Sequence, residues 1–538
     1  MKTPVNRTRV LSLLLLAALA FTLDTVVAAS MANTTDEVNH LDYGKRILRF
    51  QPDRPNFWDN SKMPVSALNA LPSAVAKVLE DRHVAPSLVS WLRSLFAARL
   101  PTVLATLLLT LFVYRWANDL YGPGPALVAA ILATLSPNII AHGTLATTDL
   151  YFALGIIVSL YYFRRYLLQP TLRNACLSGF TLGLAQLTKP FSLLLYGLVF
   201  CFLVFSLFFG RLQPERSTLV TRKNIVSYFG IALVSCLIVL NVGFCFDRPF
   251  TPLGAYRFES ASFMHLQRLP VLRSLPVPVP YPFLQGLDMM KNDEQTGISL
   301  GHIYLLGQLR ATQDPSFRGF KSYYAVALFF KEAMALQILF VLGLVWAAKN
   351  RGLHDFVFRE GLLLAPAAVL FVFLSFFNRE QIGVRHILPF FAIDVIVAAA
   401  AFVGFNSLSR VRKVILCLLV LWLGVSVASY YPHMIPYMNE WVFDRKLAYK
   451  IIADSNLDWG QNARVVAEFL KNNPDVILNP TAPVAGRILV GVNILVGLPR
   501  QDHMLWLRSH YKPVAHVAYA DLLFVVPASD LQGDSTHP

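Results

Sequence analysis

The stretch VLSLLLLAALAFTLDTVVAASMANTTDEVNHLDYG, residues 10–44, decides the class of the protein. Its first part is an apolar run long enough to cross a bilayer, and its second part carries Asp36, Glu37, His40 and Asp42. We interpret the run as an uncut anchor, because it is longer than a usual signal core and further apolar runs follow. A cleaved signal peptide ending near VVAAS is the alternative. The chain therefore leaves a membrane and presents acidic groups at once.

The composition of the whole chain fits a polytopic membrane protein. Of 538 residues, 55% are hydrophobic and 15% are charged, a balance typical of chains with many apolar spans. The formal net charge of +15 comes from short basic segments between apolar runs, where such residues set topology. We therefore expect no nucleic-acid partner. The five cysteines lie in or beside apolar runs and offer no disulfide framework and no metal-ligand spacing.

Eleven mostly apolar runs have about the length of a transmembrane helix. They lie near residues 9–31, 98–114, 124–141, 150–168, 174–188, 190–209, 225–245, 323–347, 361–377, 387–405 and 414–431. The fifth and sixth are separated only by Lys189 and Pro190. We keep them separate, because joining them would put the later basic loops on the wrong side of the membrane.

Alternate connections between these runs are rich in Lys and Arg. They are the N-terminus, RRYLLQPTLR, RLQPERSTLVTRK, KNRGLHDFVFRE and RVRK, which the positive-inside rule assigns to the cytoplasm. The remaining connections are then extracytoplasmic: residues 32–97, AHGTLATTD, LTKP, residues 246–322, NREQIGVRH, and everything after residue 431. Nearly every polar cluster falls on this outer face.

The sequence thus predicts an all-α polytopic membrane module over residues 1–431, with outer loops at 32–97 and 246–322. Within the second loop, the proline-rich RLPVLRSLPVPVPYP predicts an extended, loop-like segment. Residues 432–538 differ in composition. One helix-like piece, NARVVAEFLKN, and two β-rich pieces, GRILVGVNILVG and VAHVAYADLLFVV, indicate a small extracytoplasmic α/β domain there.

The acidic residues after the first run allow two interpretations. Thr34 or Thr35 can cap a helix whose first turn holds Asp36 and Glu37, where carboxylates interact favourably with the helix dipole. On such a helix Asp36, His40 and Tyr43 share one face, by their spacings of four and three. One carboxylate is then able to act on a substrate while its neighbour fixes the backbone or an acceptor.

Two other outer segments carry candidate groups. His142 and Asp149 lie in SPNIIAHGTLATTD, where an aspartate after two threonines is also a natural helix cap. Lys62 lies in NSKMP. A loop lysine is usually only solvated, but an ammonium beside the bilayer surface is well placed for a phosphate.

The segment NREQIGVRHILP brings Arg379, Arg385 and His386 to the outer face, against the positive-inside tendency. Two arginines on that side need a reason. An anionic ligand supplies one, and a structural salt bridge to Asp36 or Glu37 supplies another. The sequence does not choose between them.

The segment ADSNLDWGQN is a dense polar cluster with one indole ring. Its spacing of oxygen-bearing side chains resembles a calcium loop, but the required glycine and the terminal glutamate are absent. Asp, Asn and Gln side chains beside a Trp ring suit sugar hydroxyls and a sugar ring face. Taken alone, the segment is equally well a turn.

Read in order, TDEVNHLDYG, NSKMP, LSPNIIAHGTLATTDL, LGLAQLTKP, IGVRHILP and DSNLDWGQ resemble the bacterial branch of the phospholipid-carrier-dependent glycosyltransferases. This branch is related to protein O-mannosyltransferases and to the aminoarabinose transferase of lipid A, and shares the polytopic GT-C fold. The resemblance covers about residues 30 to 470, and RHILP with DSNLDWGQ are its most specific pieces. The chain has no room for the lumenal β-trefoil domain of protein O-mannosyltransferases, which speaks against a protein serine or threonine as the acceptor.

The resemblance implies transfer of a sugar from a polyprenyl-phosphate donor to an acceptor glycan, lipid or protein. The expected location is the extracytoplasmic face of the bacterial inner membrane. The catalytic candidates are Asp36 as the base, Glu37 as its partner, and Asp149 as the second acidic site. The donor phosphate is assigned to Lys62, Lys189, Arg385 and His386. The sugar or acceptor is assigned to His40, Tyr43, His142, Asp454, Asn456, Asp458, Trp459 and Gln461.

One base and a single displacement predict inversion at the anomeric carbon. We assign no metal ligand and expect no cofactor, while oligosaccharyltransferases of the same fold leave a divalent ion as the alternative. A secondary transporter is the competing function, and a non-catalytic assembly factor is the third. Transporters hold their ligands near the bilayer midplane, whereas the polar groups here gather at one surface, with Asp24 in the first run as the exception.

Overall fold

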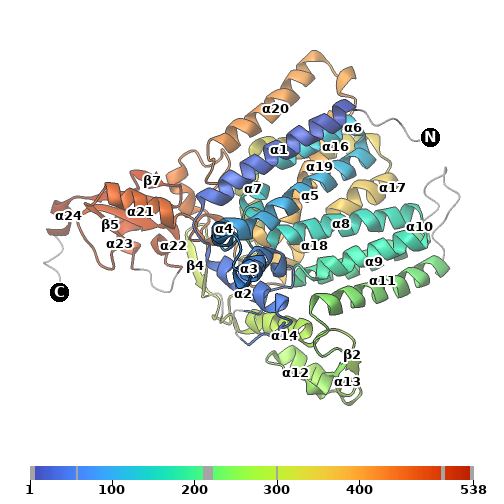
Figure 1. Cartoon of the computed structure of the whole chain (residues 1–538). Helices are drawn as coiled ribbons and strands as arrows, with labels where there is room; N and C mark the ends of the chain where they lie inside the picture. Colours follow the sequence, from blue (N-terminus) through green and yellow to red (C-terminus); the bar gives the residue numbers. More distant parts are fainter. Residues whose placement is uncertain (1–6, 56–58, 210–221, 299–300, 499–502, 533–538) are drawn as a thin grey trace.

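A bundle of apolar helices forms the main body of the molecule, and a smaller lobe with a sheet lies at one end of it (Figure 1). The computed structural model describes residues 7–55, 59–209, 222–298, 301–498 and 503–532. The helices at the predicted spans are α1 (Arg7–Ser30), α5 (Leu95–Tyr121), α6 (Pro123–Thr134) with α7 (Pro137–Gly143), α8 (Asp149–Leu168), α9 (Leu172–Gln186), α10 (Leu194–Phe209), α11 (Arg222–Gly243), α15 (Tyr323–Lys331) with α16 (Met334–Asn350), α17 (Leu353–Phe356) continued by α18 (Leu362–Phe376), α19 (Pro389–Ala398) and α20 (Arg410–Ala428).

A helix therefore lies at each of the eleven predicted spans, but fewer of these helices are long and apolar enough by themselves to cross a bilayer. Five of the described helices are long and apolar enough: α1, α5, α11, α20 and the continuous helix over residues 353–376. Counting the bent pairs α6–α7 (59°) and α15–α16 (105°) as spans raises the number to seven. The helices α8, α9, α10 and α19 are shorter or more charged. By length and composition alone, five to seven of the described helices qualify as spans. The integral membrane class is confirmed, and the number eleven stays a prediction.

The separation of the fifth and sixth runs is confirmed. Helix α9 ends at Gln186 and α10 begins at Leu194. Between them, Lys189 is extended, and Pro190 opens a short 3₁₀ turn, η2 (Pro190–Leu193). Proline disfavours helical backbone in the residue before it, which is why the chain breaks here and holds Lys189 between two helices. The predicted basic loop RLQPERSTLVTRK lies largely outside the described residues.

The centre of the bundle is α19, which packs against α5, α6, α8 and α16. Its residues from Phe391 to Ala398 are all buried. Small residues bring other helices close: a Cβ on Gly155 of α8 would lie 3.1 Å from the Cα of Ala185 in α9. Close backbone approach at small residues is how helices pack where lipid surrounds them.

The two long loops between spans are largely helical. The first contains α2 (Thr35–Leu48), α3 (Ser66–Asp81) and α4 (Pro86–Leu92); the second contains β1 (Thr251–Pro252), α12 (Ala261–Arg268), α13 (Pro270–Arg273), β2 (Pro276–Val277), α14 (Tyr281–Thr296), β3 (His302–Leu305) and β4 (Gln308–Ala311). The extended structure predicted for RLPVLRSLPVPVPYP was wrong in part, because α13 and the start of α14 lie in it. The fixed φ angle of proline suits the first turn of a helix. Both of these helices have a proline in their first turn.

The predicted α/β domain is confirmed in its secondary structure. Strands β5 (Val476–Leu478), β6 (Gly486–Gly491), β8 (Asp521–Val526) and β7 (Ala515–Val517) form a sheet in the order β5-β6-β8-β7. Helix α21 (Ala463–Asn472) covers one face with Val465, Val466, Phe469 and Leu470. The second half of GRILVGVNILVG is a helix, α22 (Val492–Leu495), and not a strand. Short apolar runs do not distinguish the two by periodicity.

Candidate functional site

The first helix after α1 starts as the sequence predicts. Thr34 is the N-cap of α2 and forms a capping box with Glu37, whose Oε2 accepts from the Thr34 backbone N–H at 2.9 Å. Asp36, one residue earlier, is not part of this capping box and pairs with Arg385 instead. The two neighbouring carboxylates therefore have different partners.

Glu37 is a buried anchor. It receives Nε and Nη2 of Arg99 in α5 at 2.8 and 2.7 Å, and the backbone N–H of Ala146 at 2.8 Å. The side chains of Glu37 and Arg99 are 0% and 1% exposed. Glu37 does not line the cavity described next, so the structure does not bring it to Asp36 as a catalytic partner. It ties α2 to α5 and to the turn before α8.

A polar cavity of about 180 Å³ lies where α2, the loop at 60–62, the start of α8, the break before α10, α14 and the loop at 380–386 meet. It gathers seven of the predicted site residues: Asp36, His40, Lys62, Asp149, Lys189, Arg385 and His386. The remaining lining residues are Asn39, Asn60, Ser61, Thr148, Pro190, Phe191, Met290, Glu380 and Ile382. Segments spread over 350 residues of the chain thus converge on one small space.

Two ion pairs organise this cavity. Nη1 of Arg385 lies 2.5 Å from Oδ2 of Asp36, and Nζ of Lys189 lies 2.5 Å from Oδ1 of Asp149. Of the two explanations for an arginine on this face, the salt bridge to Asp36 is present. A ligand explanation is still compatible with it, because a salt bridge at a cavity wall can exchange partners.

The cations dominate the electrostatics of the cavity. Burial raises the pKa of Asp36, but Arg385 and Lys62 outweigh it and hold that pKa well below the usual range of a carboxyl. Burial lowers the pKa of Lys62, and Asp36 opposes that effect. In the described part of the chain, the Lys62 ammonium has no hydrogen bond and no ion pair, although the residue is 6% exposed. An unpaired buried cation favours an anionic ligand.

The two histidines of the cavity are poised in the neutral form. Burial, reinforced by Lys62, lowers the pKa of His40 well below its ordinary value. Burial, reinforced by Lys189 and Arg385, does the same for His386. Neutral imidazoles donate and accept hydrogen bonds without adding charge, so they suit hydroxyl groups better than a second phosphate.

The loop that carries Arg385 is clamped by the DSNLDWGQ segment. Oδ1 of Asn456 accepts from the backbone N–H of Val384 at 3.0 Å, and Oγ of Ser455 donates to the carbonyl of Ile382. Between them, Gly383 has φ of 123°, and a Cβ there would lie 2.7 Å from Oγ of Ser455. Only glycine fits both the backbone angle and the space.

The same segment also supports the guanidinium of Arg385 and the start of α2. The ring of Trp459 lies 4.3 Å from the guanidinium carbon of Arg385. The backbone N–H of Ala32 donates to Gln461 at 2.8 Å, and that of Thr35 donates to Trp459 at 3.1 Å. The stretch that follows the first span is therefore joined by backbone hydrogen bonds to a motif more than 400 residues later.

Eight predicted site residues do not line the cavity. They are Glu37, Tyr43, His142, Asp454, Asn456, Asp458, Trp459 and Gln461. The assignment of the last five to sugar stays a prediction that this cavity does not support. Some of their polar atoms instead bind the backbone: Asp458 accepts from the N–H of Gly460, and Gln461 from that of Trp459. Burial raises the pKa of Asp454 to about 6.

Tyr43 and His142 are buried elsewhere. The Tyr43 hydroxyl donates to the carbonyl of Pro52 at 3.0 Å, and its ring lies between Arg46 and Arg54. The ring of His142 in α7 packs edge-on against Trp459. Tyr43 shares a helix face with Asp36, but it lies almost two turns further along α2, beyond the end of the cavity.

Glu380 is the most informative residue that sequence reasoning missed. It lies in NREQIGVRHILP, beside two arginines that were singled out, and it lines the cavity. Burial raises its pKa to about 7. The signal available was a carboxylate next to two arginines on the outer face. Among the described residues, no group of three His, Cys, Asp or Glu side chains is arranged to hold a metal ion.

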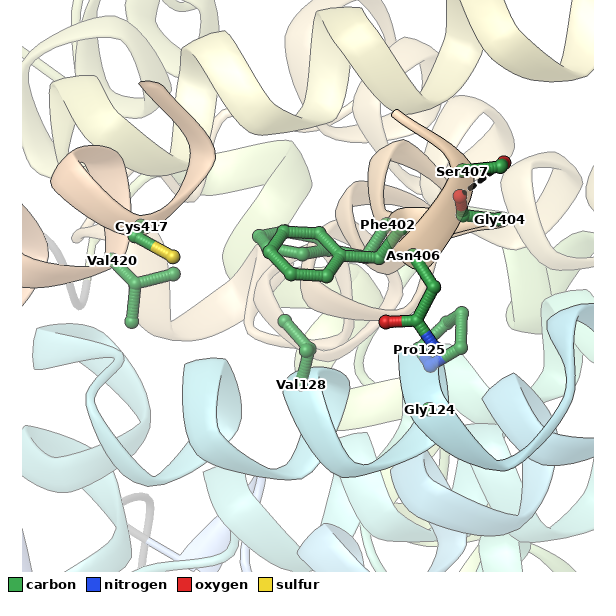
Figure 2. A pocket seen from close by; sticks show the side chains of 10 residues that line it. Gly124, Pro125, Val128, Phe402, Gly404, Asn406, Ser407, Cys417 and Val420 are labelled. Atoms are coloured by element: carbon green, nitrogen blue, oxygen red, sulfur yellow. Dashed lines mark hydrogen bonds between the residues drawn. The ribbon is translucent and has the colours of Figure 1, made fainter. Parts of the chain in front are cut away.

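Two other cavities differ in character. One of about 470 Å³ is lined almost entirely by apolar side chains of α3, α5, α8, α9 and the end of α11. The other, of about 730 Å³, lies between α6, the turn at 402–407 and α20 (Figure 2). The lining residues of this second cavity include no carboxylate, Lys, Arg or His. The polar cavity at Asp36 and Asp149 is the candidate active site, because it gathers seven of the predicted site residues.

Residues 88–241 match the family model described as dolichyl-phosphate-mannose-protein mannosyltransferase. Comparison with curated protein sequences finds no significant match. Among solved structures, the Archaeoglobus fulgidus oligosaccharyltransferase tethered to an acceptor peptide is 14% identical with a TM-score of 0.49, over 78% of this chain and 54% of that one. This chain thus spans about half the length of that enzyme.

ArnT from Cupriavidus metallidurans, bound to undecaprenyl phosphate, is 12% identical with a TM-score of 0.49, over 96% of this chain and 98% of that one. The part matched by the family model carries Asp149 and Lys189 of the cavity. The resemblance to protein mannosyltransferases inferred from the motifs is therefore confirmed for residues 88–241.

Proposed function

We propose that this chain is an integral membrane glycosyltransferase of the GT-C type. It moves a sugar from a polyprenyl-phosphate donor to a hydroxyl or amine of an acceptor. The observation that carries the proposal is the polar cavity, where three cations and three carboxylates meet at one end of an apolar bundle. The family matched by residues 88–241 is named for dolichyl phosphate mannose, a donor of this class.

The donor phosphate is placed among Lys62, Lys189 and Arg385. Lys62 is unpaired among the described residues, while Lys189 and Arg385 each hold one carboxylate. As the bond from the anomeric carbon to the phosphate oxygen breaks, charge builds on that oxygen. Cations fixed in a buried site stabilise such charge more than cations in water do.

The polyprenyl chain is placed in the apolar cavity of about 470 Å³. Three chain segments border both cavities: Lys62 with Pro64, Asp149 with Tyr151, and Lys189 with Thr188. A phosphate held at Lys62 and Lys189 therefore sits at the mouth of an apolar groove, an arrangement that fits a phosphate carrying a hydrocarbon chain. Because this hydrocarbon comes from lipid and not from water, its burial in the cavity adds little hydrophobic free energy and serves mainly to position the phosphate.

The reaction is a single displacement with inversion. The acceptor atom bonds to the anomeric carbon, the phosphate leaves with the bonding electron pair, and a carboxylate takes the acceptor proton. Asp36 is the base that the sequence predicts, with Asp149 as the second acidic site. To act as a base, Asp36 must release Arg385, and the incoming phosphate offers Arg385 another partner.

The positive-inside pattern of the basic loops supports placing this cavity on the extracytoplasmic face of a bacterial inner membrane. A lipid-linked donor suits that face, where nucleotide sugars are not supplied. The acceptor is a glycan, lipid or protein.

The test uses the purified full-length chain in nanodiscs with radiolabelled mannosyl, glucosyl, galactosyl and aminoarabinosyl polyprenyl phosphates and a cell-envelope extract as acceptor. We expect label to pass to an acceptor and polyprenyl phosphate to be released from at least one donor. Arg385→Gln should lose this transfer, while Arg310→Gln, an exposed arginine of β4, should keep it.

Mass spectrometry of the labelled acceptor identifies both the sugar and the acceptor. Uptake of a labelled sugar phosphate by proteoliposomes, with no transfer from any donor, would overturn the proposal in favour of the transporter. Normal transfer by a folded Arg385→Gln variant would move the active site away from this cavity.

A further inference from the structure

The cavity of about 730 Å³ between α6, the turn at 402–407 and α20 has no part in the proposed function (Figure 2). It shares no lining residue with the polar cavity or with the apolar cavity assigned to the polyprenyl chain. Its apolar walls are Val128 of α6, Phe402 and Phe405 of the turn, and Cys417 and Val420 of α20. Small-molecule sites have volumes of about 300–1,000 Å³ and mostly apolar walls, so this cavity has the dimensions of a site for an apolar ligand.

This cavity lies at the surface of the bundle, because α20 runs along its edge (Figure 1). The side chains of Val414, Leu418 and Leu421 in α20 are 50%, 56% and 63% exposed, and α16 is the helix against which α20 mainly packs. Exposed apolar side chains on a membrane helix contact lipid, which is as apolar as they are. Cys417 lines the cavity and is itself exposed, so a lipid chain beside α20 can enter the cavity.

One face of α20 joins the apolar cavity to basic residues. Arg410, Lys413, Cys417 and Val420 follow one another at intervals of three, four and three residues. Residues with this spacing lie on the same side of a helix. Since Cys417 and Val420 line the cavity, Lys413 and Arg410 continue the same face beyond its end. A ligand along this face therefore meets apolar side chains first and cations at the start of the helix.

Lys413 is in contact with the cavity wall. Its Nζ donates to the carbonyl of Asn406 at 2.7 Å and lies 5.9 Å from the ring centroid of Phe405, and both of these residues line the cavity. That hydrogen bond uses one of the three N–H donors of the ammonium. Two donors are left for a ligand at the end of the cavity.

The positive charge at this end has no carboxylate beside it. The guanidinium of Arg410 is exposed and forms no hydrogen bond or ion pair with any other described residue. The first turn of α20 holds no acidic residue, and the cavity lining holds none either. Basic residues in a first turn are unfavourable for the helix dipole, whereas an anion there is favourable. An anion bound at Arg410 and Lys413 therefore compensates two cations and the end of a helix.

A phospholipid with a net negative charge matches both parts of this site. Its phosphate suits the two cations, and its acyl chain suits the apolar walls. Basic pockets between membrane helices on the cytoplasmic side are the kind of site that binds anionic head groups. The segment RVRK, which holds Arg410 and Lys413, is one of the loops that the positive-inside rule assigns to the cytoplasm.

We propose that this cavity binds an anionic phospholipid of the cytoplasmic leaflet. The phosphate lies at Arg410 and Lys413, and one acyl chain lies between α6, the turn at 402–407 and α20. The lipid fills the space between α6 and α20 and so stabilises the attachment of α20 to the bundle. A ligand that binds only the folded state raises its stability. The proposal does not depend on the transfer reaction.

The experiment uses Cys417 as a reporter of occupancy. The purified full-length chain, stripped of lipid in detergent, is treated with N-ethylmaleimide, and the labelled peptides are measured by mass spectrometry. Dioleoylphosphatidylglycerol at about 10 times its Kd should slow the labelling of Cys417 roughly 10-fold. Dioleoylphosphatidylcholine, with the same chains and no net charge, and inorganic phosphate should not slow it. Cys201, an exposed cysteine of α10, is the internal control, and its labelling should stay the same throughout.

Variants of α20 test the cations. In the double variant Arg410→Gln/Lys413→Gln, phosphatidylglycerol should no longer protect Cys417 and should no longer raise the thermal unfolding temperature. Arg412→Gln is the matched control, because Arg412 is an exposed arginine of the same turn that lies about 100° around the helix from Lys413. It should keep both effects. Labelling of Cys201 at the parent rate and cooperative unfolding verify that the variants are folded.

Three results would overturn the proposal. Equal protection by phosphatidylcholine would show an apolar site without recognition of charge. Protection by phosphatidylglycerol that persists in the double variant would remove Arg410 and Lys413 from the site. Protection by inorganic phosphate or by polyprenyl phosphate, with none by phosphatidylglycerol, would assign the cavity to a free anion or to the donor lipid. The labelling needs no catalysis, so failure of sugar transfer would overturn the proposed function and leave this site standing.

Discussion

At the scale of single residues, Lys62 has the clearest consequence for substrate binding. It is the cation of the cavity that has no carboxylate within ion-pair distance in the described residues. Lys62→Met should raise the KM for donor roughly 10- to 100-fold, because a hydrogen bond to a charged group contributes about 1.5–3 kcal/mol. Steady-state kinetics measures this. Lys77→Met, an exposed lysine of α3, should change nothing; equal KM values for both variants would remove Lys62 from the phosphate site.

Glu37 has a structural consequence instead. Its replacement by Gln leaves the buried guanidinium of Arg99 without a countercharge, and breaking a buried pair costs about 3–5 kcal/mol. Glu37→Gln should therefore lower the thermal unfolding temperature and the yield of folded protein. Fluorescence-monitored unfolding in detergent measures this loss. A variant that unfolds at the parent temperature but has lost transfer would restore Glu37 to the catalytic role that the sequence predicts.

The cavity shows what sequence reasoning can reach at this scale. Residues with an unusual place in the topology, such as Lys189 in a helix break and Arg385 in a loop between spans, do line the cavity. Asp36 and Glu37 are neighbours in sequence, yet one pairs with Arg385 and the other with Arg99. That choice depends on distant segments, so no local pattern contains it. Glu380, by contrast, was missed although a local signal was present, a carboxylate in the same segment as two arginines.

At the scale of elements, the loop at 380–386 depends for its order on hydrogen bonds from the DSNLDWGQ segment at 454–461. Asn456→Ala removes three hydrogen bonds and leaves the backbone N–H of Val384 buried without a partner. We expect a loss of stability of about 1–3 kcal/mol and a fall in kcat, because Arg385 and Glu380 lose their support. Thermal unfolding and kinetics measure the two effects.

The control for this prediction is Asn473→Ala, which removes two hydrogen bonds at the end of α21, one to the carbonyl of Phe469 and one from Nη2 of Arg487. It should leave kcat unchanged. Unchanged kcat in Asn456→Ala as well would mean that the DSNLDWGQ segment does not order the loop.

Element positions were more predictable than element lengths and bends. Apolar periodicity placed a helix at each predicted span, because bilayer-length runs are unambiguous. The bends of 59° and 105° and the helix at Val492–Leu495 depend on packing partners. Short apolar or proline-rich pieces fit several structures equally well until those partners are known.

At the scale of the whole molecule, the charges of the cavity bear on the need for a metal. Lys62, Lys189 and Arg385 already supply positive charge where a divalent ion would act on a phosphate. We therefore expect transfer to continue in the presence of EDTA, with kcat within about 2-fold of the untreated protein, well short of the 10-fold that a barrier change of about 1.4 kcal/mol produces. Loss of activity on chelation, restored by Mg²⁺ or Mn²⁺, would show that an ion is required.

The hydrogen bonds between residues 32–35 and 459–461 also bear on biosynthesis. A ribosome delivers α2 to the membrane early, but the segment that α2 pairs with emerges only after all the spans have been made. Until then, Asp36 and the loop of Arg385 lack their support. We therefore expect activity to begin only after the segment at 459–461 has folded back onto residues 32–35.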